Sequence, residues 1–121
     1  MARIRLSRAA ETDIIDILVW SQSRFGDAAR QRYERLIVAA LSDIASDPLR
    51  PGSFLRSELG DGVRSWHLRV SRQRAAPAGT VVARPRHFIV YRQDPDLVVV
   101  GRLLHDAMEL ERHLRAREIW E

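Results

Sequence analysis

The period of the hydrophobic pattern changes near the middle of the chain, and this change restricts the folds that are possible. Up to Asp47 the apolar residues recur at the three- and four-residue spacing of amphipathic helices, whereas beyond Gly62 they follow the two-residue alternation of strands. A helical block followed by a block of strands is typical of an α+β domain with a mostly antiparallel sheet. With 121 residues, the chain is long enough for one such domain, which we place at 1–121.

Two amphipathic helices are predicted after a short strand over Ala2–Leu6, where arginines alternate with apolar residues. Ser7 is a suitable N-cap for the first helix, which we expect to run to about Arg24. Asp27 is predicted to cap the second helix, and Pro48 ends it because proline disfavours a helical conformation in the preceding residue. The short break between the helices predicts an antiparallel αα-hairpin. The stripes expected to face the core comprise Ala10, Ile14, Ile17, Leu18, Ser21 and Phe25 in the first helix and Ala29, Tyr33, Leu36, Ile37, Ala40, Leu41 and Ile44 in the second.

Three strands are predicted in the second half of the chain, over Val63–Val70, His87–Gln93 and Leu97–Leu104. The last of them is apolar on both faces, so we expect it to be central and covered on both sides. Asp106 begins a capping-box pattern for a C-terminal helix. The predicted fold is therefore α+β, with an N-terminal strand, an αα-hairpin, a three-stranded antiparallel meander and a C-terminal helix. The residues expected to share one face of the first of these strands are Trp66, Leu68 and Val70.

Positive charge is concentrated in the middle third of the chain. The sequence has 20 basic residues, all of them arginine, against 16 acids, for a net charge of +4. Residues 50–92 hold nine arginines and only Glu58 and Asp61 as acids, a net charge of +7. Such a concentration predicts an acidic partner, which is an acidic peptide, a nucleic acid or an acidic protein face.

The composition excludes several classes of site and partner. The absence of cysteine leaves no disulfide framework, no thiol nucleophile and no thiolate ligand for a metal. The four histidines have no metal-ligand spacing, and we expect neither a metal nor another cofactor. No apolar run approaches the roughly 18 residues that cross a bilayer, and the N terminus lacks the apolar core of a signal peptide. We therefore expect a cytoplasmic protein without a membrane partner.

The order of these segments resembles the RelE/ParE superfamily of bacterial toxins. These toxins open in a way similar to IRLSRAAETDIIDILVWSQSRFG, followed by a second helix. Their three strands are similar to GVRSWHLRV, RHFIVYR and VVVGRLLHDAMEL. Residues 102–105 read Arg-Leu-Leu-His, where the ParE branch has Arg-Val-Leu-His. The resemblance covers about the whole chain except the stretch between Val70 and His87.

This resemblance implies the toxin half of a type II toxin–antitoxin pair, of the ParE branch. It implies a hetero-oligomer with a cognate ParD-like antitoxin, a ribbon-helix-helix DNA-binding protein whose C-terminal segment wraps over the toxin. The ParE branch implies poisoning of DNA gyrase, whereas the RelE branch cuts mRNA on the ribosome.

The choice between these two activities is a chemical question. RNA cleavage needs a proton acceptor, a proton donor and cations over the phosphate. RelE-branch enzymes carry a catalytic Tyr or His-Tyr near the C terminus, but here the segment after His105 is acidic and holds no tyrosine. We expect Tyr91 to be a half-buried sheet residue and His105 to orient a backbone carbonyl or to bond Asp106, so no catalytic residue is predicted.

Two alternatives stay open at this point. The first is a RelE-type ribosome-dependent mRNA endonuclease, which would use Arg64, Arg92 and Arg102 with Tyr91 or His105. The second is a plain nucleic-acid-binding module that rests on the basic middle third. Single-strand binders interleave aromatic with basic residues, yet the long basic connection before the second predicted strand holds no aromatic residue.

Two groups of binding residues are predicted. Ile15, Val19 and Val38 are apolar but lie off the core stripes, so we expect them to contact the antitoxin. The basic residues on or beside the strands that we assign to the same partner are Arg64, Arg69, Arg92 and Arg102. The residues assigned to the target are Arg72, Arg74, Arg84, Arg86 and His105. Most of them lie in a basic hairpin insertion at 71–86, which is either an arm that grips a partner or a tolerated surface loop.

Overall fold

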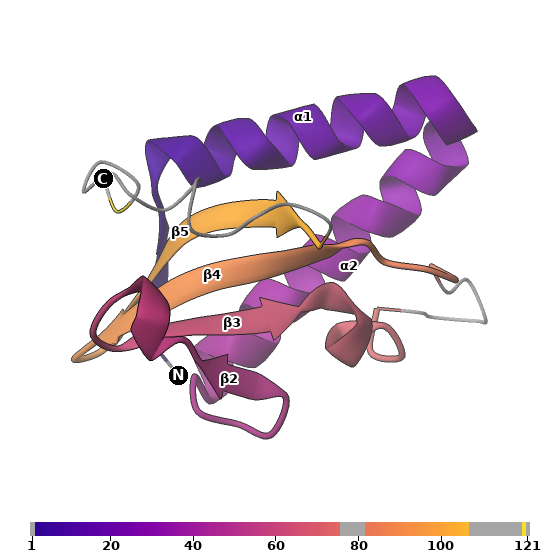
Figure 1. Cartoon of the computed structure of the whole chain (residues 1–121). Helices are drawn as coiled ribbons and strands as arrows, with labels where there is room; N and C mark the ends of the chain where they lie inside the picture. Colours follow the sequence, from indigo (N-terminus) through magenta and orange to yellow (C-terminus); the bar gives the residue numbers. More distant parts are fainter. Residues whose placement is uncertain (1, 76–81, 107–119, 121) are drawn as a thin grey trace.

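The computed structural model describes residues 2–75, 82–106 and 120, and shows two helices packed on one side of a five-stranded sheet (Figure 1). This arrangement confirms the α+β class. The elements in chain order are β1 (Arg3–Leu6), α1 (Arg8–Phe25), α2 (Asp27–Ser46), β2 (Ser53–Leu55), η1 (Ser57–Leu59), β3 (Val63–His67), η2 (Leu68–Ser71), β4 (His87–Asp94) and β5 (Leu97–His105), where η marks a short 3-10 helix. Within the described ranges, neither helix is long and apolar enough to cross a membrane.

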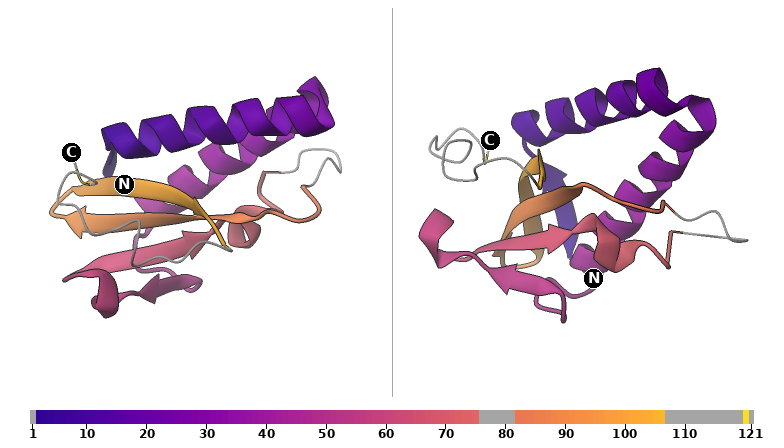
Figure 2. Two further views of the ribbon diagram at one scale, coloured as in Figure 1. Left: turned by 45° about the horizontal axis from the view of Figure 1, so that its top comes forward. Right: turned by 45° about the vertical axis from the view of Figure 1, so that its right-hand side comes forward.

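The strands of the sheet lie in the order β1-β5-β4-β3-β2, with β1 parallel to β5 and every other pair antiparallel. β5 therefore lies inside the sheet, between β1 and β4, as its apolar sequence predicts. Val98, Val99 and Val100 are each at most 1% exposed, so both faces of this strand are covered. The views in Figure 2 show that both helices cover the same face of the sheet.

The antiparallel part of the sheet has four strands, whereas the sequence predicted a meander of three. The additional strand, β2, pairs with β3 from Ser53↔Trp66 to Leu55↔Arg64. A strand of three residues in a turn-rich stretch is too short to show an alternating pattern, so the period of the sequence does not reveal it. The predicted C-terminal helix after Asp106 lies outside the described residues.

Strand β3 is shorter than predicted, because the chain turns into η2 at Leu68 instead of continuing to Val70. The ring of His67 stabilises this turn, since its Nδ1 accepts a hydrogen bond of 3.1 Å from the backbone N–H of Arg69. Leu68 still reaches the core, but Val70 is 43% exposed and does not share the inner face.

The helical hairpin follows the predicted boundaries closely, with two corrections. Ser7 caps α1 as predicted, and its Oγ accepts a hydrogen bond of 3.0 Å from the N–H of Ala10. Gly26, with a positive φ of 92°, ends α1 and is also the N-cap of α2, so Asp27 is the first residue of α2 and not its cap. Phe25 is 64% exposed and not part of the core, because the hairpin extends beyond the sheet at this corner (Figure 1).

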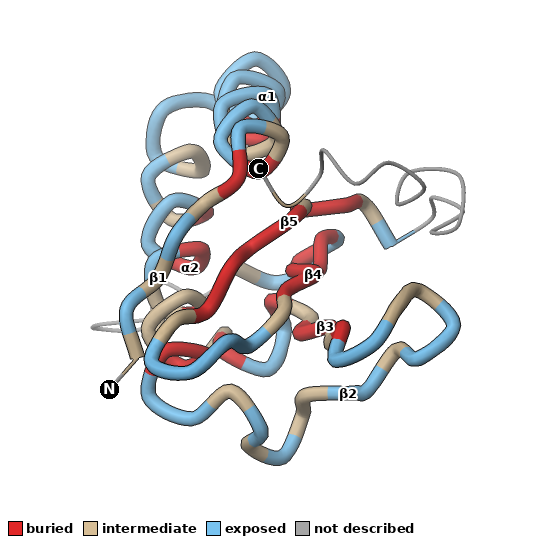
Figure 3. The backbone as a smooth tube through the Cα atoms, turned by 90° about the vertical axis from the view of Figure 1, so that its left-hand side faces the viewer, coloured by how far each residue is buried: buried red, intermediate tan, exposed pale blue. Residues whose placement is uncertain are grey.

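The face of the sheet turned away from the helices has a smaller apolar cluster of its own. Its buried members are Val63, Phe88, Val90 and Leu104. Trp120 packs against this cluster, and its carbonyl oxygen accepts a hydrogen bond of 2.6 Å from the guanidinium of Arg5. The guanidinium of Arg92 lies 4.9 Å from the centre of the Trp120 ring. β5 is therefore covered on this side too, and Figure 3 shows it buried along most of its length.

A buried carboxylate on α2 ties this helix to the chain beyond β3. Asp43 is 2% exposed, and its Oδ2 accepts a hydrogen bond of 2.6 Å from the hydroxyl of Ser71. That hydroxyl in turn accepts a hydrogen bond of 2.9 Å from Nε1 of buried Trp66. The guanidinium groups of Arg50 and Arg74 pair with the other carboxylate oxygen. A carboxylate this deeply buried needs such a full set of partners, so it holds each of them in place.

Replacing Asp43 by asparagine is expected to lower the free energy of unfolding by about 2–4 kcal/mol, because an amide loses the charge that its donors require. Asp16→Asn, at an exposed position of α1, is the matched control and should change this free energy by less than about 0.5 kcal/mol. Urea unfolding followed by tryptophan fluorescence measures both values. Equal stability of the two variants would contradict the role given to Asp43.

Candidate functional site

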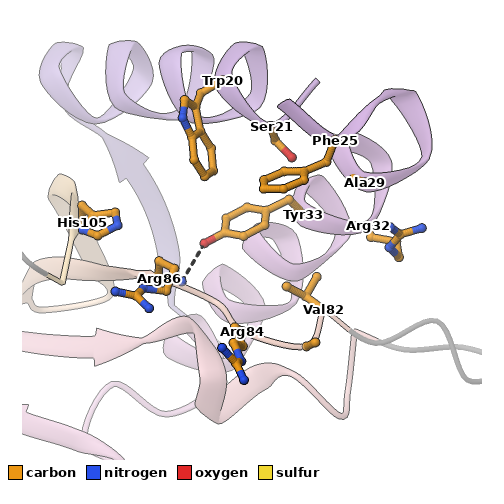
Figure 4. Close-up of a pocket in the computed structure, with 11 residues that line it drawn as sticks. Trp20, Ser21, Phe25, Ala29, Arg32, Tyr33, Val82, Arg84, Arg86 and His105 are labelled. Carbon is orange, nitrogen blue, oxygen red and sulfur yellow. Dashed lines mark hydrogen bonds between the residues drawn. The ribbon is translucent and has the colours of Figure 1, made fainter. Parts of the chain in front are cut away.

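A pocket of about 470 Å³ lies where the end of α1, the start of α2 and the segment before β4 meet (Figure 4). Its walls are the rings of Trp20 and Phe25 from α1 and Tyr33 from α2, and we call it the aromatic pocket. Its volume lies in the range of about 300–1,000 Å³ that is usual for ligand sites. No carboxylate is among the described residues that line it. The cationic or titratable groups at its rim are Arg32, Arg84, Arg86 and His105.

Two of the three aromatic walls are exposed to solvent. Trp20 is 42% exposed and Phe25 is 64% exposed. Their rings meet edge to face with centroids 5.6 Å apart, and the guanidinium of Arg24 lies 5.9 Å from the centre of the Trp20 ring. Large apolar side chains gathered at a hollow of the surface are typical of a binding site.

Tyr33, which lines the pocket, forms a buried hydrogen-bonded pair with His87. The hydroxyl of Tyr33 lies 2.7 Å from Nδ1 of His87 and accepts a hydrogen bond of 3.2 Å from the backbone N–H of Arg86. Burial raises the pKa of Tyr33 to about 12. Burial, with a smaller effect of neighbouring His105, lowers the pKa of His87 to about 4. Both side chains are therefore neutral near pH 7, and the tautomer of His87 decides which of them donates the hydrogen bond between them.

Asp106 joins the rim of the pocket to the end of β3. Its Oδ1 lies 3.5 Å from Nε of Arg86 and 3.6 Å from Nδ1 of His105, and its Oδ2 lies 3.2 Å from Nε2 of His67. Partial burial opposes ionisation of Asp106, but the hydrogen bond with His67 and the charge of Arg86 outweigh it and lower the pKa of the carboxyl. Burial lowers the pKa of His67. His105 thus lies beside the Asp106 carboxylate, but the 3.6 Å between them is too long for a hydrogen bond.

The five residues assigned to the target fall into two groups. Arg84, Arg86 and His105 converge on the aromatic pocket. Arg72 instead donates a hydrogen bond of 3.0 Å to the carbonyl of Ala83, and Arg74 pairs with Asp43. Arg86 and His105 of the first group also contact Asp106, whereas Arg72 and Arg74 bond residues at or beside the described ends of the 71–86 segment.

The apolar residues assigned to the antitoxin are all exposed, but the structure does not gather them in one hollow. Ile15 and Val19 are 61% and 59% exposed on α1, and Val38 is 61% exposed on α2. Val38 lines a shallow hollow beside Arg35. Ile15 and Val19 are four residues apart, so they share one exposed face of α1.

The arginines assigned to the antitoxin have different surroundings. Arg102 forms a two-pronged ion pair with Asp13, at 2.7 and 3.0 Å. Arg64 donates a hydrogen bond of 2.6 Å to the hydroxyl of Ser53. Arg69 is exposed and, on the face of the sheet away from the helices, borders a hollow of about 220 Å³. The fourth is Arg92, which lies over Trp120 as described above.

Of the endonuclease alternative's residues, Arg64 lies beside Tyr91, and both bond the hydroxyl of Ser53. Tyr91 is fully buried, and its hydroxyl donates a hydrogen bond of 2.5 Å to the carbonyl of Pro48. Burial raises the pKa of Tyr91. Three residues of β4 lie between Tyr91 and His87, which pairs with His105, so the two candidate groups of this alternative lie roughly 13 Å apart along the sheet.

The structure instead reveals three pocket residues that sequence reasoning did not assign to a site, namely Trp20, Phe25 and Tyr33. Phe25 and Tyr33 lie on the predicted core stripes, so the hydrophobic pattern indicates burial in the core and not a binding site. Trp20 lay on no stripe, and a tryptophan off the core face of a helix was the one available signal. Among the described residues, no three carboxylate or imidazole side chains are grouped in a way that would hold a metal ion.

Acid is expected to destabilise the protein through His87. The folded protein protonates this residue only near pH 4, whereas the unfolded chain does so near pH 6.5, so the unfolded chain binds more protons between these values. The free energy of unfolding should therefore fall by about 2 kcal/mol between about pH 7 and about pH 5. His87→Phe should remove most of this dependence, and His105→Gln should keep most of it. Urea unfolding at the two pH values measures the difference, and an unchanged slope in His87→Phe would refute the assignment.

Comparison with known proteins identifies the family. The family model described as the ParE toxin of the type II toxin–antitoxin system parDE matches residues 4–110. Toxin ParE1 of Caulobacter vibrioides is 29% identical over 114 residues, which cover 94% of this chain and 99% of that toxin. The chain belongs to the ParE family of toxins of type II toxin–antitoxin systems.

Proposed function

We propose that this toxin acts by binding and poisoning DNA gyrase in the cytoplasm, and that a cognate ParD-like antitoxin neutralises it in a hetero-oligomer. The observation that carries the proposal is the aromatic pocket, whose rim holds three arginines and a histidine. The described residues that line it include no carboxylate, although Asp106 contacts Arg86 and His105 beside the rim. A hollow with apolar walls and a basic rim is complementary to an acidic macromolecular surface. The choice of gyrase follows from membership of the ParE branch.

The protonation states around the pocket favour binding over RNA cleavage. With a pKa of about 12, Tyr33 keeps its proton at neutral pH, and with a pKa of about 4, His87 stays uncharged. Neither group is matched to proton transfer near pH 7. Tyr91, the tyrosine of the endonuclease alternative, is buried and bonded to a carbonyl. We therefore infer that the toxin is not a ribonuclease.

For the antitoxin, we propose a contact along the outer face of α1 and onto the sheet. Ile15 and Val19 offer the apolar part of this contact, and Val38 extends it to α2. Arg69 and Arg92 are the arginines best suited to acidic antitoxin side chains. Arg64 already bonds Ser53, and Arg102 already bonds Asp13. We therefore expect these two arginines to hold neighbouring side chains of the surface in place.

Loss of the two arginines at the pocket rim should weaken the action on gyrase. We expect the Arg84→Ala/Arg86→Ala variant to need about tenfold more toxin for half-inhibition of plasmid supercoiling, because each exposed arginine contact contributes about 0.5–1 kcal/mol. The matched control is Arg3→Ala/Arg35→Ala, which removes the same charge from exposed positions of β1 and α2. Failure of the unaltered toxin to inhibit gyrase, together with codon-phased mRNA cuts in a translating extract, would favour the endonuclease instead.

Charges placed on the outer face of α1 should disrupt the antitoxin complex. Ile15→Asp/Val19→Asp is expected to weaken binding at least about a hundredfold, because each apolar side chain contributes about 1.5–3 kcal/mol when it is fully buried. Both side chains are exposed in the free toxin, so the fold should persist. Calorimetry with the antitoxin encoded beside the toxin measures the affinity. Phe54→Asp/Leu55→Asp, equally exposed on β2, is the control and should bind as the unaltered chain does.

A further inference from the structure

We propose that the aromatic pocket binds one nucleotide of a single-stranded nucleic acid, with its base between the aromatic walls and its flanking phosphates on the rim. This inference goes beyond the proposed toxin function, because it names a ligand and does not depend on which protein the toxin poisons. It rests on the shape of the pocket, on the charge of its rim, and on the packing that brings the aromatic rings and the arginines together.

The walls of the pocket suit a flat ring. Trp20 and Phe25 project from α1 and Tyr33 from α2, and Figure 4 shows their rings turned toward a common space. The hydroxyl of Ser21 and the guanidinium of Arg32 also line this space and offer polar groups to the edge of a base. Stacking of a base on an aromatic side chain contributes about 1–3 kcal/mol and tolerates any base.

The rim suits the phosphates on both sides of that base. Figure 4 shows Arg32 and His105 on opposite sides of the Tyr33 ring, with Arg84 and Arg86 between them along the segment before β4. A nucleotide within a strand carries one phosphate on each side, and the nitrogen groups of Arg32 and His105 on two sides of the slot, with the two arginines between them, match this arrangement. Arginine is suited to both oxygens of a phosphate because its donors form a fork.

The fold brings aromatic side chains to the basic residues that precede β4. No aromatic residue lies between Arg69 and Arg86 in the sequence, so the segment alone does not resemble a single-strand binder. Packing of the helical hairpin brings three aromatic rings against Arg84 and Arg86, and this yields the combination of stacking surface and cations that single strands require. Paired bases are stacked inside a duplex and do not enter such a slot, so the ligand is a single strand.

The probe for this proposal is a fluorescein-labelled single-stranded adenine oligonucleotide, with binding followed by fluorescence anisotropy. We expect Trp20→Leu and Arg86→Ala each to weaken binding by about fivefold to a hundredfold, from the loss of stacking or of a phosphate contact. Trp20 is partly exposed, and the hydrogen bond from Arg86 to Tyr33 comes from the backbone, so both variants should fold. The controls are Phe54→Leu on β2 and Arg35→Ala on α2, which should bind like the unaltered chain.

Several outcomes would overturn the proposal. These are the absence of binding, equal binding of a duplex of the same length, and equal affinity in all four variants, which would indicate a diffuse basic surface. Binding of an acidic tryptophan-containing peptide that depends on Trp20, without such dependence for the oligonucleotide, would assign the pocket to a protein partner. Supercoiling by gyrase is assayed in parallel on the same variants, so failure of nucleotide binding is distinguished from failure of the toxin function.

Discussion

Valines and leucines occupy both faces of strand β5, so both faces have to be covered, and this requirement determines where the other elements pack. β5 lies between β1 and β4, with the helices on one side and Trp120 on the other. Asp13 of α1 then fixes the helix to the strand, since it accepts hydrogen bonds from the guanidinium of Arg102 at 2.7 Å and from the N–H of Leu103 at 2.9 Å. With helix and strand joined in this way, the end of β5 brings His105 to the rim of the pocket.

The aromatic pocket forms where the helical hairpin passes beyond the end of the sheet. Trp20 and Phe25 have no strand beneath them, so they remain exposed and become walls. Tyr33 still reaches β4, and its hydroxyl is held 2.7 Å from the ring of His87. Because this pair is buried and neutral near pH 7, it places no charge under the site.

The long periodic segments of the fold are predictable from the sequence, because burial of one face imposes a regular pattern on a helix or strand of sufficient length. Strand β2 has three residues and shows no such pattern. Periodicity also assigns a side chain to a face without showing where the neighbouring layer ends. Phe25 and Tyr33 both lie on core stripes, yet Phe25 projects past the sheet and only Tyr33 is buried. The pocket that they share arises because the helical hairpin extends farther than the sheet beneath it. A sequence pattern does not show how far each layer extends.

The net charge of residues 50–92 overstates the positive charge that a partner contacts, because several of these arginines pair with carboxylates of the toxin itself. Arg50 and Arg74 pair with Asp43, and Arg56 lies 3.9 Å from Glu58, so these arginines serve the fold itself. Contacts with an acidic partner release counterions in proportion to the cations that it engages. Salt dependence of binding at the aromatic pocket should thus reflect roughly three cations, not the nine arginines of the segment. Contact with the aromatic walls is little affected by screening, so that part of the affinity should persist as the salt concentration rises.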